Sequence, residues 1–220
     1  MRIAIAGTGR LGLSLLGPLL ASEHKVVAVV QDGRHMSRLS RWWAPLMNPM
    51  AARARLLRLP IVWIDKMSAQ ELAPLREVAP DILLVGGFGV ILKRAVLNLP
   101  RIGCVNVHSS MLPKHRGPNP FCAVILTGET ESGVTFHVMD EGIDTGDIID
   151  QTRFPLRPDG DVFSVYDRAC LTACARVVPV MDRIASEGLY GIPQNHAAAT
   201  YDKKLTESDT WIRWDQPAAL

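Results

Sequence analysis

The residues of this chain that could do chemistry gather at the ends of two apolar segments. Asn106 and His108 close the first segment, and Asp144 lies in the loop that follows the second one. A carboxamide N–H can stabilise an oxyanion, an imidazole can exchange a proton, and a carboxylate can orient and charge-stabilise that imidazole. This combination of residue types favours acyl transfer.

The residues alone also leave a structural interpretation open. Asn106 and His108 are two positions apart and therefore share one face of a strand. A polar pair at the end of a strand is often only the partner of a turn. Asp147, the second acid of the same loop, we take as structural, since such residues more often cap a turn.

The glycine-rich segment Gly86–Leu92 follows a predicted buried strand. Open α/β sheets usually bind ligands at the carboxyl ends of their strands. Glycines there let a flat ring approach the backbone, while Phe88, Val90 and Leu92 would line an apolar slot. A plain turn between a strand and a helix fits the segment equally well.

The surrounding sequence resembles the folate-dependent formyltransferases, and most of all the N-terminal catalytic domain of the methionyl-tRNA formyltransferases. The resemblance runs from Met1 to Asp215 and departs from the family pattern between Gln31 and Leu59. Members of that family continue into a second, barrel-like domain, which we expect this chain to lack. The residues that carry the resemblance are Asn106, His108, Ser110-Met111-Leu112-Pro113, Arg116-Gly117 and Asp144-Thr145-Gly146-Asp147.

The resemblance implies that a formyl group passes from 10-formyltetrahydrofolate to a primary amine. Asn106 and protonated His108 would hold the oxyanion, and Asp144 would orient His108 and relay a proton through water. Arg116 and Gly117 would border the path of the amine. The residues implied in folate binding are Gly87, Phe88, Gly89, Val90, Leu92, Ser110, Met111, Leu112, Pro113, Val138, Asp140, Glu141, Gly142 and Ile143.

The segment Gly7–Gly12 reads Gly-Thr-Gly-Arg-Leu-Gly, and Asp32 follows Gly12 by twenty residues. This pattern is typical of a dinucleotide-binding turn. The resembling formyltransferases have the same turn without a nicotinamide, and glycines can serve tight geometry alone. We therefore expect no NAD. Arg10 remains a candidate contact for an anionic substrate group, because helix N-termini favour anions.

Short apolar runs alternate with helical patterns along the chain. The runs predicted as buried strands are Ile3–Ala6, Val26–Val30, Ile61–Ile64, Ile82–Val85 and Cys104–Val107. They lack polar alternation, which is typical of a parallel sheet covered on both faces. The sequence therefore predicts an α/β fold with a doubly wound, mostly parallel sheet and helices on both faces, the Rossmann-like formyltransferase fold.

Two helix starts are readable from single residues. Ser68 and Glu71 form a capping box for a helix that ends before Pro80. Pro118 and Pro120 suit the first turn of another helix. Both predicted helices lie between predicted strands, as a doubly wound fold requires.

The second half of the chain is predicted to be less regular. After Gly133, two strands separated by the loop 140–146 are expected to form a hairpin, and 162–187 is expected to be a long closing helix. We assign 1–193 to a formyltransferase catalytic domain. The polar remainder, 194–220, is expected to be a linker-like tail that packs back on the core or frays.

Composition excludes several classes of protein. The net charge is +2, so no bulk field favours nucleic acid. No apolar run approaches the roughly 20 residues that span a bilayer, and we expect no membrane span. No signal peptide precedes the chain, so we expect a cytoplasmic protein. The cysteines, which lack metal-ligand spacing and predict no metal site, are Cys104, Cys122, Cys170 and Cys174.

The sequence leaves the amine acceptor open. The segment 31–59 holds six arginines and one acid, interleaved with Trp42 and Trp43. Such a segment could meet the phosphates of a charged initiator tRNA, form a lid or dimer contact, or be only a solvated face. Three functions stay open: a formyltransferase for methionyl-tRNA or for another amine such as an amino sugar, a 10-formyltetrahydrofolate hydrolase, and a dinucleotide-binding or non-enzymatic module.

Overall fold

The structure is a computed structural model that describes residues 1–211. Its strands are β1 (Arg2–Ala6), β2 (Lys25–Asp32), β3 (Ile61–Ile64), β4 (Ile82–Gly86), β5 (Gly103–His108), β6 (Glu131–Val138) and β7 (Ile148–Pro155). Its helices are α1 (Arg10–Leu20), α2 (Arg38–Trp43), α3 (Pro49–Leu56), α4 (Ala69–Glu77), α5 (Arg94–Leu97), α6 (Pro120–Leu126) and α7 (Val162–Glu187), with 3-10 turns η1 (Ala44–Leu46), η2 (His196–Ala198) and η3 (Glu207–Thr210). Within these residues no helix is long and apolar enough to cross a membrane.

All seven strands form one sheet in the order β3-β2-β1-β4-β5-β6-β7. Strands β1 to β5 run parallel, whereas β6 is antiparallel to both β5 and β7. The five predicted parallel strands, the hairpin and the closing helix are thereby confirmed. The doubly wound, mostly parallel α/β fold is confirmed as well.

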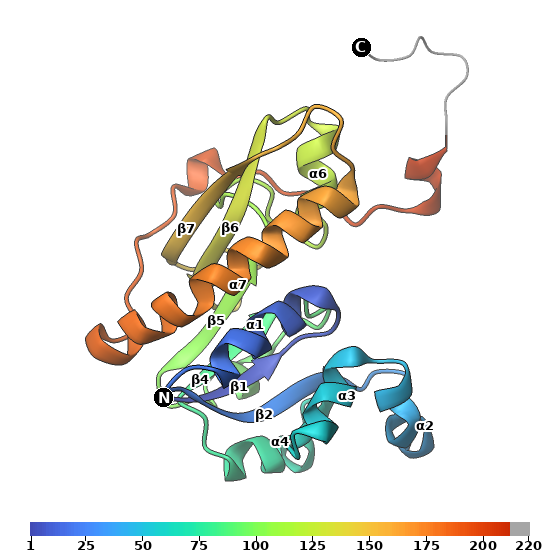
Figure 1. Ribbon diagram of the computed structural model, residues 1–220, viewed down its shortest axis with the longest axis vertical. Coiled ribbons are helices and arrows are strands. Elements are labelled where there is room, and N and C mark those ends of the chain that lie inside the picture. Colours follow the sequence, from blue (N-terminus) through green and yellow to red (C-terminus); the bar gives the residue numbers. More distant parts are fainter. Residues whose placement is uncertain (212–220) are drawn as a thin grey trace.

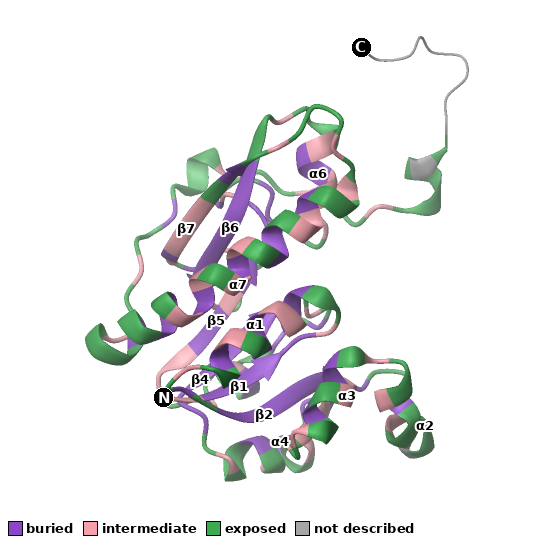
Figure 2. Cartoon of the chain, viewed as in Figure 1, coloured by how far each residue is buried: buried purple, intermediate pink, exposed green. Residues whose placement is uncertain are grey.

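Helices cover both faces of the sheet (Figure 1). Alternate residues of β1 show why: Ile3 and Ile5 enter the core beneath α1 and α7, while Ala4 and Ala6 enter the core beneath α4. Figure 2 shows the central strands mostly buried, β7 at the edge of the sheet mostly of intermediate burial, and the outer faces of the helices exposed. Apolar side chains on both faces explain why the strands show no polar alternation in sequence.

Two element boundaries differ from the sequence-based expectation, and one agrees with it. Helix α6 begins at Pro120 behind an Asn119 N-cap, so Pro118 lies outside its first turn. Strand β6 begins at Glu131, before Gly133. The capping box of Ser68 and Glu71 at the start of α4 is confirmed.

The segment 31–59 is folded against the edge of the sheet, with α2, η1 and α3 in succession. Its anchor is Gln31, a buried residue whose amide donates to the carbonyls of Gly7 and Val30 and accepts a hydrogen bond from Asn48. Asn48 in turn caps α3 through its side-chain oxygen. Two tryptophans of this segment, Trp42 and Trp43, remain more than half exposed.

Part of the expected tail packs back on the core. Gln194 is buried, and Tyr201 forms an isolated bridge with Arg116. The residues 207–209 and Trp211 are exposed. Trp214 and the rest of 212–220 lie outside the described residues.

The turn between β1 and α1 depends on glycine because two backbones meet there. A Cβ at Gly7 would lie 2.6 Å from the carbonyl oxygen of Gly86, at the end of β4. In contrast, a Cβ at Gly17, an exposed position inside α1, would meet nothing within 4 Å. Gly7 is therefore required for the close packing of the turn against β4, whereas Gly17 has no such role.

We expect Gly7→Ala to lower the free energy of unfolding by roughly 1–3 kcal/mol, because the added methyl group must push the turn away from β4. Gly17→Ala is the matched control and should raise stability by up to about 1 kcal/mol, because alanine is the better helix former. Chemical denaturation of both variants measures the two changes. Equal stability of the two variants would contradict the assigned contact.

Candidate active site

A cavity of about 560 Å³ opens at the carboxyl ends of β4 and β5, where the site was expected. The predicted residues that line it are Gly87, Phe88, Gly89, Val90, Leu92, Asn106, His108, Gly117, Asp140, Gly142, Ile143 and Asp144. The lining residues that the sequence analysis did not select are Leu11, Val85, Ile91, Val107, Ser109, Pro118, Pro120, Phe121, His137, Met139, Tyr166 and Tyr201. The walls are therefore largely apolar, with polar groups concentrated at one end.

Four residues expected at the folate site do not line this cavity. Ser110, Met111, Leu112 and Pro113 form the turn after β5, and their polar groups are bound inside the protein. The Ser110 hydroxyl donates to the Lys114 carbonyl at 2.7 Å, and the Leu112 N–H donates to the Thr135 hydroxyl. This turn supports the site from behind the cavity wall, and its assignment to folate binding stays a prediction.

Two further folate candidates lie elsewhere. Val138 and Glu141 line a second hollow that also contains Arg94. The Glu141 carboxylate makes two hydrogen bonds to Arg94, at 2.8 and 2.9 Å, on an exposed surface. Glu141 therefore fixes its loop against α5, and its expected contact with folate stays a prediction.

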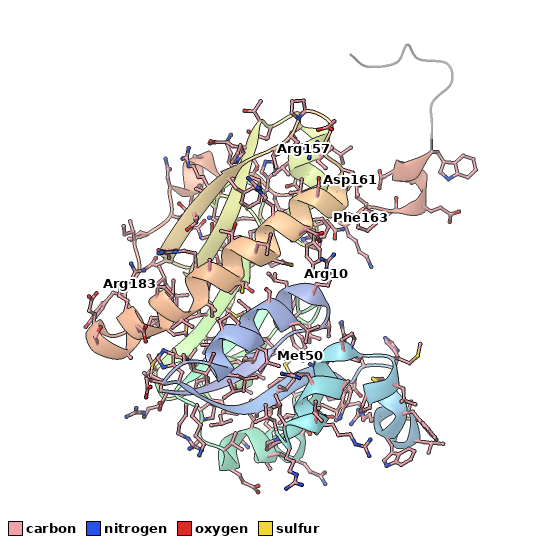
Figure 3. All side chains as sticks on the ribbon, in the orientation of Figure 1. Arg10, Met50, Arg157, Asp161, Phe163 and Arg183 are labelled. Carbon is pink, nitrogen blue, oxygen red and sulfur yellow. The ribbon has the colours of Figure 1, made fainter. Side chains whose placement is uncertain are left out.

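The two arginines proposed for substrate binding have protein partners instead. Arg10 forms a 2.5 Å ion pair with Asp167 of α7, and Figure 3 shows its side chain between α1 and α7. Arg116 is buried and donates to Gln194 at 2.7 Å. Neither arginine lines the cavity, whereas Gly117 does, and the substrate contacts expected of the two arginines stay predictions.

Asn106, His108 and Asp144 come together at the polar end of the cavity. The Asn106 amide donates to Oδ1 of Asp144 at 3.2 Å, and Nδ1 of His108 lies 3.6 Å from Oδ2. The backbone N–H of Gly117 donates to Oδ2 at 2.9 Å. One carboxylate thus contacts the amide, the imidazole and the turn that follows the β5 segment.

His108 is almost completely buried, and this fixes its charge in the free protein. Its Nε2 lies 2.8 Å from the carbonyl oxygen of His115, which can only accept, so Nε2 carries the proton. Burial lowers the pKa of His108 below its ordinary value, and the charge of Asp144 opposes the shift without cancelling it. The imidazole is therefore neutral at pH 7 in the free protein, and the protonated form expected to hold the oxyanion stays a prediction for the reaction itself.

Asp144 is ionised although it is mostly buried. Burial raises the pKa of this carboxyl, but its hydrogen bonds, among them that from the N–H of Gly117, and the positive charge of a protonated His108 outweigh burial and hold it at about 2. Its backbone has φ 54°, in the left-handed region that aspartate tolerates better than most residues. The loop conformation therefore aims the carboxylate back at β5.

His137 is a site residue that the sequence analysis missed. It stands opposite Asn106 in the β5–β6 register, and its Nε2 lies 3.1 Å from the Asn106 amide nitrogen and 3.5 Å from Oδ1 of Asp144. Its Nδ1 lies 2.8 Å from the Val138 carbonyl. The signal was a histidine inside an apolar strand of the segment that already carried the family resemblance.

The contacts of His137 also determine which partners the two N–H groups of the Asn106 amide have. Because Nδ1 of His137 donates to a carbonyl, Nε2 is left as an acceptor. The two N–H groups of Asn106 are then divided between His137 and Asp144. An oxyanion can bind to Asn106 only in exchange for one of these partners.

The glycine turn at the start of α1 is closed by a side chain from α7. The hydroxyl of Tyr166 accepts a hydrogen bond from the N–H of Leu11 at 3.1 Å, at the helix end where a dinucleotide phosphate binds in other folds. Asp32, the expected ribose contact, is paired with Arg34 at 2.8 Å. The helix N-terminus and the carboxylate that a dinucleotide would contact are thus both bound to side chains of the protein.

The described residues contain no cluster of three or more His, Cys, Asp or Glu side chains placed to hold a metal ion. The four cysteines are free thiols. Burial raises the pKa of Cys104 to about 12, which removes it as a nucleophile. The polar side chains at this end of the cavity are imidazole, carboxylate and amide groups, and they lie beside an apolar slot.

Comparison with known proteins agrees with this geometry. The formyl transferase family matches residues 1–178. Curated methionyl-tRNA formyltransferases from Moorella thermoacetica and Pseudomonas paraeruginosa are each 34% identical, over 100% and 99% of this chain and 70% of their own length. The chain thus spans about two thirds of these relatives.

Solved structures show the same architecture. An N-formyltransferase from Helicobacter canadensis, in complex with folinic acid and dTDP-3-aminofucose, is 25% identical, with a TM-score of 0.69 over 91% of this chain and 70% of that one. A sugar N-formyltransferase from Shewanella reaches a TM-score of 0.74 at 18% identity, over 100% of this chain and 84% of its own, and shares the fold. From the family match, the curated relatives and the site described above, this chain belongs to the formyl transferase family.

Proposed function

We propose that this chain transfers the formyl group of 10-formyltetrahydrofolate to the amino group of methionyl-tRNA. The observation that carries the proposal is the contact of Asn106, His108 and Asp144 on one cavity wall, in a chain of the formyl transferase family. The choice of acceptor is supported by the curated relatives, which are methionyl-tRNA formyltransferases at 34% identity.

The cavity suits a flat, partly polar donor. Its volume of about 560 Å³ lies within the usual range for a small-molecule site. Phe88, Val90 and Leu92 supply apolar contact, and Gly87 and Gly89 leave the backbone open to a ring. We assign the pterin to this slot, with the formyl group directed to the polar end.

Formyl transfer needs a group that removes a proton from the attacking amine. Nδ1 of neutral His108 bears the free lone pair, since Nε2–H is bound to a carbonyl. Nδ1 faces the Asp144 carboxylate across 3.6 Å, so a positive charge formed on the ring is stabilised at once. His108 is the proposed general base, and Asp144 orients it and stabilises its charged form. When the tetrahedral intermediate collapses, the bond between the formyl carbon and N10 of the folate breaks, and the protonated His108 returns its proton to N10.

The oxygen of the formyl group gains negative charge as the amine attacks. Asn106 is the proposed donor: it would release His137, keep Asp144 and direct the freed N–H to that oxygen. Such a donor contributes on the order of 100- to 1000-fold in rate. His137 then holds the amide in position before the donor binds.

Tetrahydrofolate release from 10-formyltetrahydrofolate is the first measurement. We expect release to require charged initiator methionyl-tRNA and to fall by roughly 100- to 10,000-fold in His108→Ala, because the variant lacks the general base. Binding of a stable folate analogue to the same variant should persist and shows that the cavity is intact.

Two outcomes would contradict the assignment. Release without any amine would make the protein a hydrolase of the same folate, and release only with an amino sugar would replace the acceptor. Wild-type turnover in His108→Ala would remove the catalytic role of this histidine.

The charge of His108 gives an independent prediction. Because the Asp144 carboxylate opposes the effect of burial, Asp144→Asn should move the pKa of His108 further below its ordinary value of 6.5. In the wild-type protein the imidazole should stay neutral down to below pH 6.5 and protonate only under more acidic conditions. An NMR titration of the ring measures both, and an unchanged or higher value in the variant would contradict the assigned interaction.

The acceptor surface can be tested through ionic strength. Arg53, Arg55 and Arg58 are exposed, and phosphate contacts from them would make tRNA binding weaken steeply with salt. Replacing all three by alanine should lower the slope of log Kd against log salt by about 1 for each phosphate that an arginine no longer neutralises. A matched triple substitution of Arg153, Arg157 and Arg168 should leave the slope unchanged, and equal slopes for both triples would exclude this surface.

A further inference from the structure

The chain that follows α7 returns to the catalytic wall as an extended strap, defined here as residues 188–202. Figure 1 shows it leaving the end of α7 and passing along the outer side of β7, where Ile192 pairs with Ile148. It lies beyond residues 1–178, which the family matches. Its hydrogen bonds nevertheless reach two segments of the site: the loop that carries Asp144, and the turn 115–117, whose backbone binds His108 and Asp144. These two segments are called the catalytic loops below.

One side chain of the strap, Gln194, bridges both catalytic loops. It is 5% exposed, and its amide nitrogen donates to the carbonyls of Asp144 at 2.9 Å and Gly146 at 2.7 Å. Its amide oxygen accepts from the Arg116 guanidinium at 2.7 Å. Every hydrogen-bonding group of this glutamine except one lone pair is thus used, and all of its partners belong to loops that carry the site.

The second half of the strap fixes the turn that holds His108. The Thr200 hydroxyl accepts from the N–H of His115 at 2.8 Å, and its carbonyl accepts from the N–H of Arg116 at 3.0 Å. Asp202 accepts from the His115 ring at 2.9 Å. His115 is the residue whose carbonyl binds Nε2 of His108.

The strap also approaches the other end of this turn. A Cβ at Gly117 would collide with the carbonyl oxygen of Asp202, so the two backbones are packed without an intervening side chain. Gly117 is the residue whose N–H binds the Asp144 carboxylate. The strap therefore touches both turn residues whose backbone groups orient His108 and Asp144.

We infer that Gln194 is a positioning residue for the transfer reaction, which sets the distance between the Asp144 carboxylate and His108 by tying the loop of one to the turn of the other. The inference rests on the proposed function, because a rate must exist for the distance to matter. The direct hydrogen bond between the Asp144 loop and this turn runs from the N–H of Gly117 to the Asp144 carboxylate, and Gln194 adds a second link between the two. Displacements of about 1 Å at such a site commonly cost about 100-fold in rate.

Two variants separate the contacts of this glutamine. Gln194→Ala removes all of them, while Gln194→Glu keeps an acceptor for Arg116 and loses the N–H donors to the Asp144 loop. We expect kcat to fall by about 10- to 100-fold in both. Affinity for a folate analogue should change by less than about threefold, since Gln194 does not line the cavity.

The titration of His108 provides the readout that a purely structural role would not move. If the carboxylate recedes in Gln194→Ala, the pKa of His108 shifts in the same direction as in Asp144→Asn. Asn195→Ala is the control within the strap, because Asn195 only caps η2 and touches neither catalytic loop. It should retain kcat within twofold and an unchanged His108 titration.

A kcat within twofold of wild type in both Gln194 variants, or an unchanged His108 titration in Gln194→Ala, would overturn the inference. If the wild-type protein transfers no formyl group to any amine, the proposed function fails, whereas the titration still decides whether Gln194 holds Asp144 near His108. If Gln194→Ala does not fold, kcat and the His108 titration are both measured on Gln194→Glu instead.

Discussion

The antiparallel pairing of β6 with β5 is the constraint on which the site depends. It places His137 opposite Asn106 and turns the chain back so that the following loop brings Asp144 over His108. Strand β6 ends at Val138, opposite Val105, so the loop that follows it begins beside β5, and Asp144 reaches Asn106 and His108 from there. The change of strand direction thus converts a general α/β ligand site into a wall with three interacting polar side chains.

Two opposing electrostatic effects meet on this wall. Burial disfavours charge on both His108 and Asp144, yet only the histidine is neutral at pH 7, and the carboxyl stays ionised. The carboxylate stays charged because hydrogen-bond donors surround it, whereas Nε2 of the imidazole reaches only a carbonyl. A neutral base beside a fixed negative charge is suited to accepting a proton, since the product of that step is an ion pair with good geometry.

Sequence predicted the architecture well, because strand burial and the Ser68 capping box are local properties of the chain. It also brought together Asn106, His108 and Asp144. It did not reveal the protein partners of the two arginines: Arg10 pairs with Asp167 and Arg116 with Gln194, which are 157 and 78 positions away along the chain. Such partners are set by tertiary packing, and no local pattern reports them.

The position of Tyr166 bears on the order in which the parts of the fold come together. Its hydrogen bond to Leu11 joins residues 155 positions apart, and its ring forms part of the cavity wall. Contacts of such long sequence separation form late in folding, because loop-closure entropy must be overcome first. The parallel core can therefore form while the donor cavity is still open on one side, and a partly folded chain would hold its apolar slot exposed to chaperones and to aggregation until α7 docks.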